Sequence, residues 1–142
     1  MAINTGKVVV GGIAATVVNM AVGFVAFQMM LGAKFAAEME AAMPGAAAKM
    51  SASPALNFVG PVVNGFLVAW LYAAMRPRFG PGMKTAMMAA LPVWIGGAVF
   101  FLNDIGLGMM SWGTYVTASL AALVMTVAAA AAAGAVYKEE GA

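Results

Sequence analysis

The stretch Arg76-Pro77-Arg78-Phe79-Gly80-Pro81-Gly82-Met83-Lys84 decides how this chain folds. It holds three of the seven positive charges and two of the six prolines, and it contains no negative charge. The apolar stretches on either side, residues 50–75 and 85–103, carry no charged residue. About 20 apolar residues cross the hydrocarbon core of a bilayer, so each flank is long enough for a transmembrane helix. We therefore interpret these nine residues, called the basic hairpin below, as a cytoplasmic connection between two membrane-spanning helices.

The composition predicts a lipid environment. Hydrophobic residues make up 64% of the chain and charged residues only 8%, whereas a soluble domain carries roughly 25% charged residues. The net charge of +2 is too small to favour a nucleic-acid partner. The chain has no cysteine and no histidine, which removes disulfides, the commonest zinc ligand and the commonest general base. We expect a protein that is not an enzyme and holds no metal or intrinsic cofactor.

The hydropathy pattern predicts an all-α membrane protein, a single domain over residues 1–142. The expected spans lie at about residues 8–32, 54–75, 84–103 and 111–137. The first apolar run exceeds the roughly 7–15 residues of a signal peptide, so we expect it to be retained. It continues into a short extramembrane extension, helical to about Met43, before the second helix begins. Ser53-Pro54 has the pattern of a helix N-cap followed by a proline at the first helical position.

The basic residues predict the orientation. With four helices, both termini and the basic hairpin lie on one side of the membrane. That side carries Lys7, Arg76, Arg78, Lys84 and Lys138, and the other side carries Lys34 and Lys49. The positive-inside rule then places both termini in the cytoplasm of a bacterial inner membrane.

The basic hairpin itself has three predicted roles. Arg76, Arg78 and Lys84 anchor the adjoining helix ends at the lipid headgroups. Arg76, held before Pro77, ends the second helix, because the residue before a proline disfavours helical geometry. Pro81-Gly82 suits a type II turn, in which glycine supplies the positive φ angle.

A layer of small and polar residues is predicted near the middle of the bilayer. Asn19 and Asn64 each lie twelve residues from a basic residue, about 18 Å along a helix. The same layer includes Thr126, Gly96 and Gly97. We expect Asn19 and Asn64 to form a hydrogen bond between helices, either as structural glue or as the lining of a small permeation site beside Pro61.

Two small-residue stripes accompany this layer. One is Gly11-Ala15-Asn19-Gly23 on the first helix, and the other is Asn57, Gly60 and Asn64 on the second. Stripes of this type allow membrane helices to approach closely, so we expect both to pack against neighbouring helices.

Other candidate residues are few. Asp104 is expected to be a turn residue, with a proton-coupled role as the alternative. Glu38 and Glu40 are expected to decorate a solvated helix face. The methionines Met39, Met43, Met83 and Met87 form two pairs at four-residue spacing, a pattern that could hold Cu(I) but is more often packing.

The run from Tyr72 through the basic hairpin to Trp94 resembles a segment of small, uncharacterised four-helix bacterial integral membrane proteins. In that group a tyrosine-containing helix end precedes a basic Phe-Gly-Pro-Gly-like hairpin and a tryptophan-bearing helix. The resemblance covers the middle third of the chain, and the flanking helices match by hydropathy only. It implies the four-helix architecture and transfers no catalytic residue.

Three functional classes remain open from these observations. We expect a non-catalytic accessory or structural subunit of a larger inner-membrane complex, of the respiratory or photosynthetic type. Its partners would be lipids and other integral membrane subunits or copies of itself, and pigment contact would come only through the host complex. The alternatives are a small oligomeric transporter or channel built on the asparagine layer, and a scaffold that binds anionic lipids through the basic hairpin.

Overall fold

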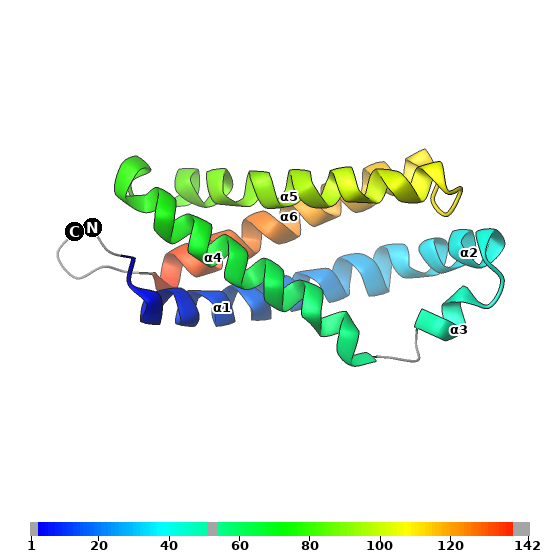
Figure 1. Ribbon diagram of the computed structural model, residues 1–142, viewed down its shortest axis with the longest axis horizontal. Coiled ribbons are helices and arrows are strands. Elements are labelled where there is room, and N and C mark those ends of the chain that lie inside the picture. Colours follow the sequence, from blue (N-terminus) through cyan, green and yellow to red (C-terminus); the bar gives the residue numbers. More distant parts are fainter. Residues whose placement is uncertain (1–2, 51–53, 138–142) are drawn as a thin grey trace.

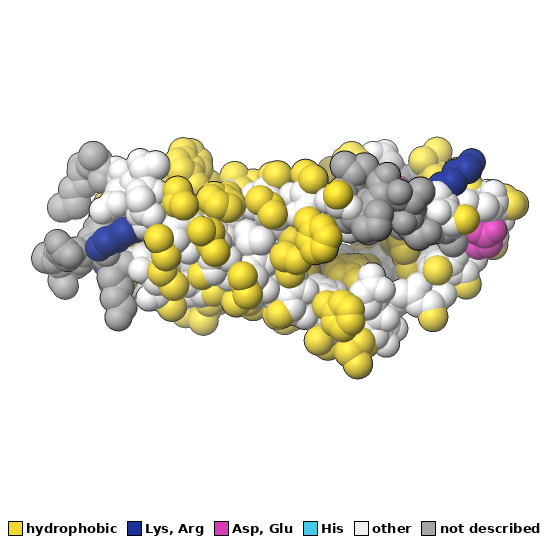
Figure 2. Space-filling model, turned by 90° about the horizontal axis from the view of Figure 1, so that it is seen from below, with side chains coloured by type: hydrophobic (Ala, Val, Ile, Leu, Met, Phe, Trp, Pro, Cys, Tyr) yellow, Lys and Arg dark blue, Asp and Glu magenta, His cyan; other side chains and the backbone are white. Residues whose placement is uncertain are grey.

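The computed structural model describes residues 3–50 and 54–137. Across those two ranges the secondary structure is helical, with no strand. Four helices are long and apolar enough to cross a membrane, and they are Thr5–Ala42, Val59–Phe79, Met83–Gly106 and Trp112–Val136. The predicted all-helical fold, with four helices long and apolar enough to span a membrane, is therefore confirmed. Apolar side chains cover the middle of the bundle, and charged side chains lie toward its ends (Figure 2).

The first membrane helix is one continuous rod made of three segments. They are α1 (Thr5–Gly23), a π-helix η1 (Phe24–Leu31) and α2 (Gly32–Ala42), with Met43 as the C-cap. The predicted helical extension to about Met43 is thus confirmed. The rod has 38 residues, more than the roughly 20 that a bilayer requires, so α2 extends beyond the apolar run. A Cβ atom on Gly32 would lie 2.6 Å from the Phe27 carbonyl oxygen, so glycine is needed where the π-helix ends.

The second membrane helix begins later than the predicted residue 54 and corrects the prediction made for Pro77. A short helix α3 (Ala46–Met50) and a 3-10 turn η2 (Pro54–Phe58) lead into α4 (Val59–Phe79). Ser53, the predicted N-cap, lies outside the described residues. Pro61 falls in the first turn of α4, where backbone amides have no intrahelical partner, so it is not an interior proline. Pro77 lies inside α4, so the helix does not end at Arg76 as predicted.

The turn between α4 and α5 is built by glycines and by two side-chain hydrogen bonds. Gly80 has φ 80° and Gly82 has φ 118°, a region that favours glycine, so α4 ends at Gly80. The predicted positive φ at Gly82 is confirmed. Its ψ angle of −173° does not fit a type II turn, which needs a value near 0°. The Gly82 amide donates to the Tyr72 hydroxyl (3.0 Å), and the Thr85 hydroxyl donates to the Gly80 carbonyl (2.6 Å).

The last two membrane helices are α5 (Met83–Gly106) and α6 (Trp112–Val136). α5 continues through Pro92 and ends at Gly106, beyond the predicted residue 103. Helix α6 begins and ends almost where the sequence predicts. The Ser111 hydroxyl caps it by accepting a hydrogen bond from the Thr114 amide at 3.3 Å.

The four rods form a bundle that is tightest near the basic hairpin. α1 packs against α4 and α6, and α5 packs against α6 and α4 (Figure 1). The start of α1 and the end of α6 lie at the same end of the bundle as the α4–α5 turn. There the Asn4 amide donates to the Tyr137 hydroxyl at 3.3 Å, and the Tyr137 ring lies 6.3 Å from that of Tyr72. The buried core in this half is mostly alanine, and includes Ala69, Ala73, Ala86, Ala89, Ala90, Ala129, Ala130 and Ala133.

The helices approach one another most closely at glycines, but not every residue of the two predicted small-residue stripes takes part in such a contact. Along the predicted stripe of α1, Gly11, Ala15 and Asn19 are buried, which agrees with a packing face. In the predicted second stripe, Asn57 of η2 and Gly60 of α4 are exposed, so this part of the stripe does not pack against the other described helices. The close contact is at Gly65, where an added Cβ atom would meet the Thr16 backbone nitrogen at 2.7 Å.

Replacing Gly65 by alanine should destabilise the bundle, because the backbone of α1 would have to move away from α4. We expect Gly65→Ala to lower the free energy of unfolding by about 1–3 kcal/mol, the usual cost of overpacking. The measurement is unfolding in mixed detergent micelles, followed by circular dichroism.

Gly60→Ala is the matched control on the same helix. A Cβ atom on Gly60 would have no neighbour within 4 Å, so this variant should be as stable as the parent or slightly more so. Equal stability of the two variants would contradict the close α1–α4 approach.

Candidate functional site

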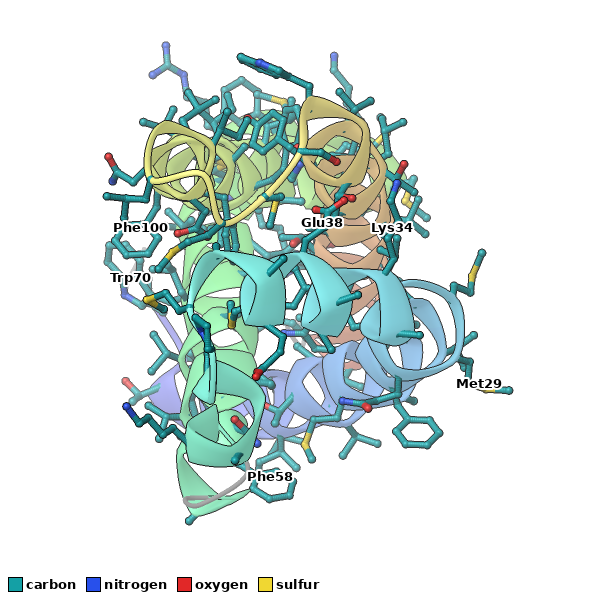
Figure 3. All side chains as sticks on the ribbon, turned by 90° about the vertical axis from the view of Figure 1, so that its right-hand side faces the viewer. Met29, Lys34, Glu38, Phe58, Trp70 and Phe100 are labelled. Atoms are coloured by element: carbon teal, nitrogen blue, oxygen red, sulfur yellow. The ribbon has the colours of Figure 1, made fainter. Side chains whose placement is uncertain are left out.

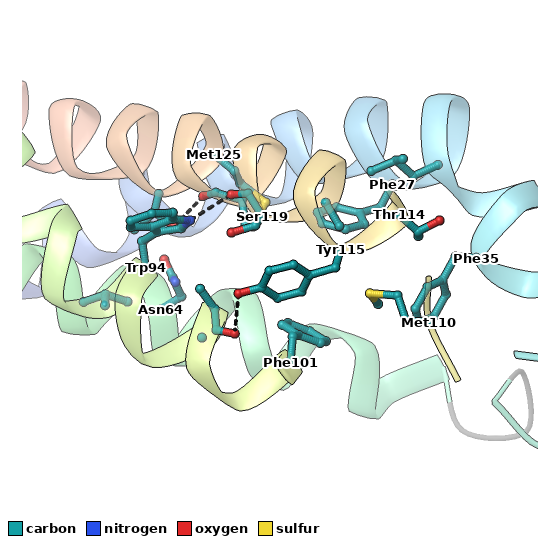
Figure 4. Close-up of a pocket in the computed structure, with 17 residues that line it drawn as sticks. Phe27, Phe35, Asn64, Trp94, Phe101, Met110, Thr114, Tyr115, Ser119 and Met125 are labelled. Atoms are coloured by element: carbon teal, nitrogen blue, oxygen red, sulfur yellow. Dashed lines mark hydrogen bonds between the residues drawn. The ribbon is translucent and has the colours of Figure 1, made fainter. Parts of the chain in front are cut away.

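The half of the bundle remote from the basic hairpin, called the distal half below, contains a cavity of about 410 Å³. It lies among η1, α2, α5 and α6, and α4 contributes one residue, Asn64. Its large wall side chains are aromatic residues and methionines (Figure 4), namely Phe27, Phe35, Trp94, Phe101, Met110, Tyr115 and Met125. The sequence did not predict this cavity, because its wall residues come from six separate segments, including the α5–α6 connection.

The predicted mid-membrane layer is divided by the fold. Asn64, Gly97 and Thr126 line the cavity. Gly96 is exposed, and no atom lies within 4 Å of where its Cβ would be, so it does not pack within the chain. Asn19 is 1% exposed and lies in the α1–α4 contact.

The predicted Asn19–Asn64 hydrogen bond does not form. Asn19 Nδ2 instead donates to the Pro61 carbonyl oxygen at 3.3 Å. The reason is the register of the two antiparallel helices, which is set by the contact of Gly65 with Thr16. One turn farther along α1 lies Asn19, and one turn earlier on α4 lies Pro61, so these two residues face each other. Asn64 is turned toward α5 and α6.

Most polar groups in the cavity wall are already paired. Trp94 Nε1 donates to the Ser119 carbonyl (2.8 Å), and the Tyr115 hydroxyl donates to the Ala98 carbonyl (3.1 Å), as Figure 4 shows. Both bonds tie α5 to α6. The Thr126 hydroxyl donates to the Ala122 carbonyl within α6 (2.8 Å). Asn64 differs, because its Oδ1 atom is buried and has no hydrogen-bond partner within the described residues.

The cavity has one closed end and one side at the bundle surface. Beyond Asn64 and Thr126, toward the basic hairpin, the alanine-rich core is buried, and Ala89, Ala90 and Ala130 are each 0% exposed. In contrast, Gly97 and Phe101 belong to the cavity wall and are also exposed. The cavity is therefore reached from the surface of α5 and ends near the middle of the bundle.

A carboxylate fastens the distal end of the bundle. Glu38 on α2 accepts hydrogen bonds from the Ser111 amide (3.0 Å), the Ser111 hydroxyl (2.8 Å) and the Thr114 hydroxyl (2.7 Å). These donors lie at the N-terminus of α6, where a negative charge is favourable. Glu38 therefore does more than decorate a solvated helix face, the role predicted for it, because it joins α2 to α6. Glu40 is exposed, in agreement with that prediction, and accepts from the Gly45 amide (2.7 Å). Spacing could not reveal this, because the Glu38 partners are more than 70 residues away.

Glu38 lies in the part of α2 beyond the apolar run, where its titration has a consequence for stability. The Ser111 backbone hydrogen bond, followed by the two hydroxyls, holds the pKa of the Glu38 carboxyl below its usual value. A carboxyl whose pKa is lowered in the folded state stabilises the fold at pH values above the usual pKa of a carboxyl. That contribution is lost as the pH falls through the lowered value.

Glu38→Gln should therefore lower the thermal unfolding midpoint at neutral pH, and the difference from the parent should shrink under acidic conditions. The physical reason is that protonation of Glu38 in the parent removes the same charge-assisted hydrogen bonds as the substitution. Thermal unfolding of both proteins across a pH series measures the difference. A gap that stays constant across the series would contradict the role given to the carboxylate charge.

The three basic residues of the hairpin lie in different environments. Arg76 is only 8% exposed, and its guanidinium lies 5.7 Å from the centre of the Tyr137 ring. It is therefore packed inside this end of the bundle, rather than extended toward headgroups. Arg78 and Lys84 are exposed, as their predicted role requires.

The remaining candidates gain no partners that define a site. Asp104 lies in the last turn of α5 rather than in the predicted turn that follows the helix, and its carbonyl accepts from the Met109 amide (2.8 Å). Within the described ranges, no group of three histidine, cysteine or acidic residues could hold a metal ion. Met43, Met83 and Met87 are exposed at the surface, and the copper hypothesis stays a prediction.

Comparison with known proteins adds no assignment: no family model, curated protein or solved structure matches the chain. The resemblance drawn from the residues between Tyr72 and Trp94 therefore stays a prediction.

Proposed function

We propose that this protein is a non-catalytic accessory subunit that packs against other membrane proteins in a bacterial inner membrane. The observation that carries the proposal is the exposed face of α5 around Gly96. Pro92, Gly96 and Phe100 follow one another at four-residue spacing and are all exposed, and Phe100 is 70% exposed. Figure 3 shows Phe100 projecting away from the bundle.

An exposed glycine in the middle of a membrane helix favours a partner helix over lipid. Glycine costs roughly 1 kcal/mol in a helix relative to alanine, and no contact within the chain compensates at Gly96. A second helix can approach the bare backbone closely and gain dispersion contacts there. The neighbouring Phe100 ring would pack against the same partner. This arrangement supports association with other subunits or with copies of the chain.

The orientation belongs to the same proposal. Lys7, Arg76, Arg78 and Lys84 lie toward one end of the bundle, together with the first turn of α1 and the α4–α5 turn. Lys34 and Lys49 lie toward the other end. The positive-inside rule then supports a cytoplasmic location for both termini and the basic hairpin. The host would be a complex of the respiratory or photosynthetic type, with lipids, and pigments of the host, in contact with the apolar helix faces.

Gly96→Leu tests the proposal, because the substitution fits the isolated chain but not a close helix interface. We expect the variant to fold like the parent and to lose most of its higher-order assembly. The measurement is native mass spectrometry of the protein, extracted gently from its own membranes and compared with the parent for associated subunits.

Gly106→Leu is the matched control, since Gly106 is also exposed on α5 and has no atom within 4 Å of its Cβ position. It should keep its partners. The proposal is overturned if the parent is recovered as a lone monomer, or if the Gly96 and Gly106 variants assemble equally well.

A small oligomeric transporter or channel is the second candidate, and the cavity at Asn64 and Thr126 is the observation that favours it. Because the alanine-rich core closes the half near the basic hairpin, a path would have to run between chains. Solute flux into liposomes that contain the purified oligomer separates this candidate from the accessory subunit.

A further inference from the structure

We propose that the distal cavity is a binding site for an uncharged, mostly hydrocarbon molecule that carries a hydroxyl group. The hydroxyl donates to the Oδ1 atom of Asn64, and the hydrocarbon body lies among the aromatic side chains. This site goes beyond the accessory role proposed above, and neither proposal requires the other.

The size and the wall of the cavity set the body of the ligand. Ligand pockets generally measure about 300–1,000 Å³, and this cavity is about 410 Å³. No charged residue lines it, so a charged ligand would lie in the bundle without a counterion, at a high desolvation cost. Trp94, Phe101 and Tyr115 supply ring faces and edges, which favour flat aromatic groups. The occupant is therefore apolar and ring-shaped.

Asn64 sets the polar group of the ligand. A buried amide oxygen without a partner costs free energy that a hydrogen bond would recover. The donors of Trp94, Tyr115 and Thr126, which line the same wall, are engaged with backbone carbonyls. The unpaired Oδ1 atom is an acceptor, so the ligand must supply a donor, which a hydroxyl does and a carbonyl oxygen does not.

The position of Asn64 sets how the ligand lies. Figure 4 shows Asn64 beside Trp94 at one end of the cavity, with Phe35 and Met110 at the other. The oxygen of the ligand is therefore held near the middle of the bundle, and its body extends toward the distal end. A phospholipid would lie the opposite way, with its polar headgroup at the membrane surface. Entry from the bilayer is available beside Gly97 and Phe101, which are exposed wall residues.

Three probes of nearly equal shape test the site, namely naphthalene, 1-naphthol and 1,4-naphthoquinone. The thermal unfolding midpoint of the purified full-length protein in detergent is measured against probe concentration, because a ligand that binds the native state raises it. We expect 1-naphthol to bind the parent about 3–10-fold more tightly than naphthalene, the value of one net hydrogen bond. The quinone 1,4-naphthoquinone has no donor, so it should bind no more tightly than naphthalene.

Two variants separate the roles of Asn64 and of the cavity. Asn64→Leu should bind all three probes with similar affinity, because only the hydrogen bond is removed. Gly97→Leu should bind none, since its side chain would occupy the cavity. A Cβ atom at Gly97 meets no atom within 4 Å, so the fold has room for it.

The proposal is overturned if naphthalene binds the parent as tightly as 1-naphthol. It is also overturned if the probes shift the parent and Gly97→Leu equally, because they would then act through the detergent micelle. Should Asn64→Leu fail to fold, the comparison of probes on the parent and on Gly97→Leu still decides the question.

Discussion

The close contact of α4 with α1 at Gly65 is the constraint on which the rest of the bundle depends. An added Cβ atom there would lie within 2.7 Å of the Thr16 backbone nitrogen, so only glycine permits this approach. The contact sets the register of the two antiparallel helices. Asn19 then pairs with the carbonyl of Pro61, while Asn64 is turned toward α5 and α6. Because Gly65 has no side chain, Asn19 and Asn64 lie in different environments.

The two halves of the bundle differ because their side chains differ in size. Near the basic hairpin, alanines fill the space between helices, and the Tyr72 hydroxyl accepts from Gly82 in the turn. In the distal half, aromatic residues hold the helices farther apart, and Glu38 fastens α2 to the start of α6. The first half is a closed core, and the second surrounds a cavity. The accessory role and the ligand site both involve α5, where Gly96 faces outward and Gly97 lines the cavity.

The positions of the helices could be predicted from local sequence rules, but the contacts between residues of different helices could not. The four spans and the helical extension to Met43 were predictable, because hydropathy depends on neighbours in the chain. Pro77 was misjudged, since a proline in the last turn removes only one hydrogen bond and Gly80 ends the helix instead. Glu38 was misjudged because its partners come from α6. The cavity was missed because its wall residues, taken singly, have the composition of any membrane helix.

Composition and the spacing of charges were sufficient to establish a helical membrane protein with four spans and to predict its orientation. Long uncharged runs in a chain with 8% charged residues have no other stable arrangement, because each backbone amide in lipid must be paired within its own helix. The depth of each residue in the bilayer could also be estimated from the sequence, since the helical rise per residue is constant. Which residues at one depth meet was decided by the tertiary structure alone. Helix rotation and register depend on small contacts such as Gly65 with Thr16, and these directed Asn64 into the cavity and Gly96 to the surface.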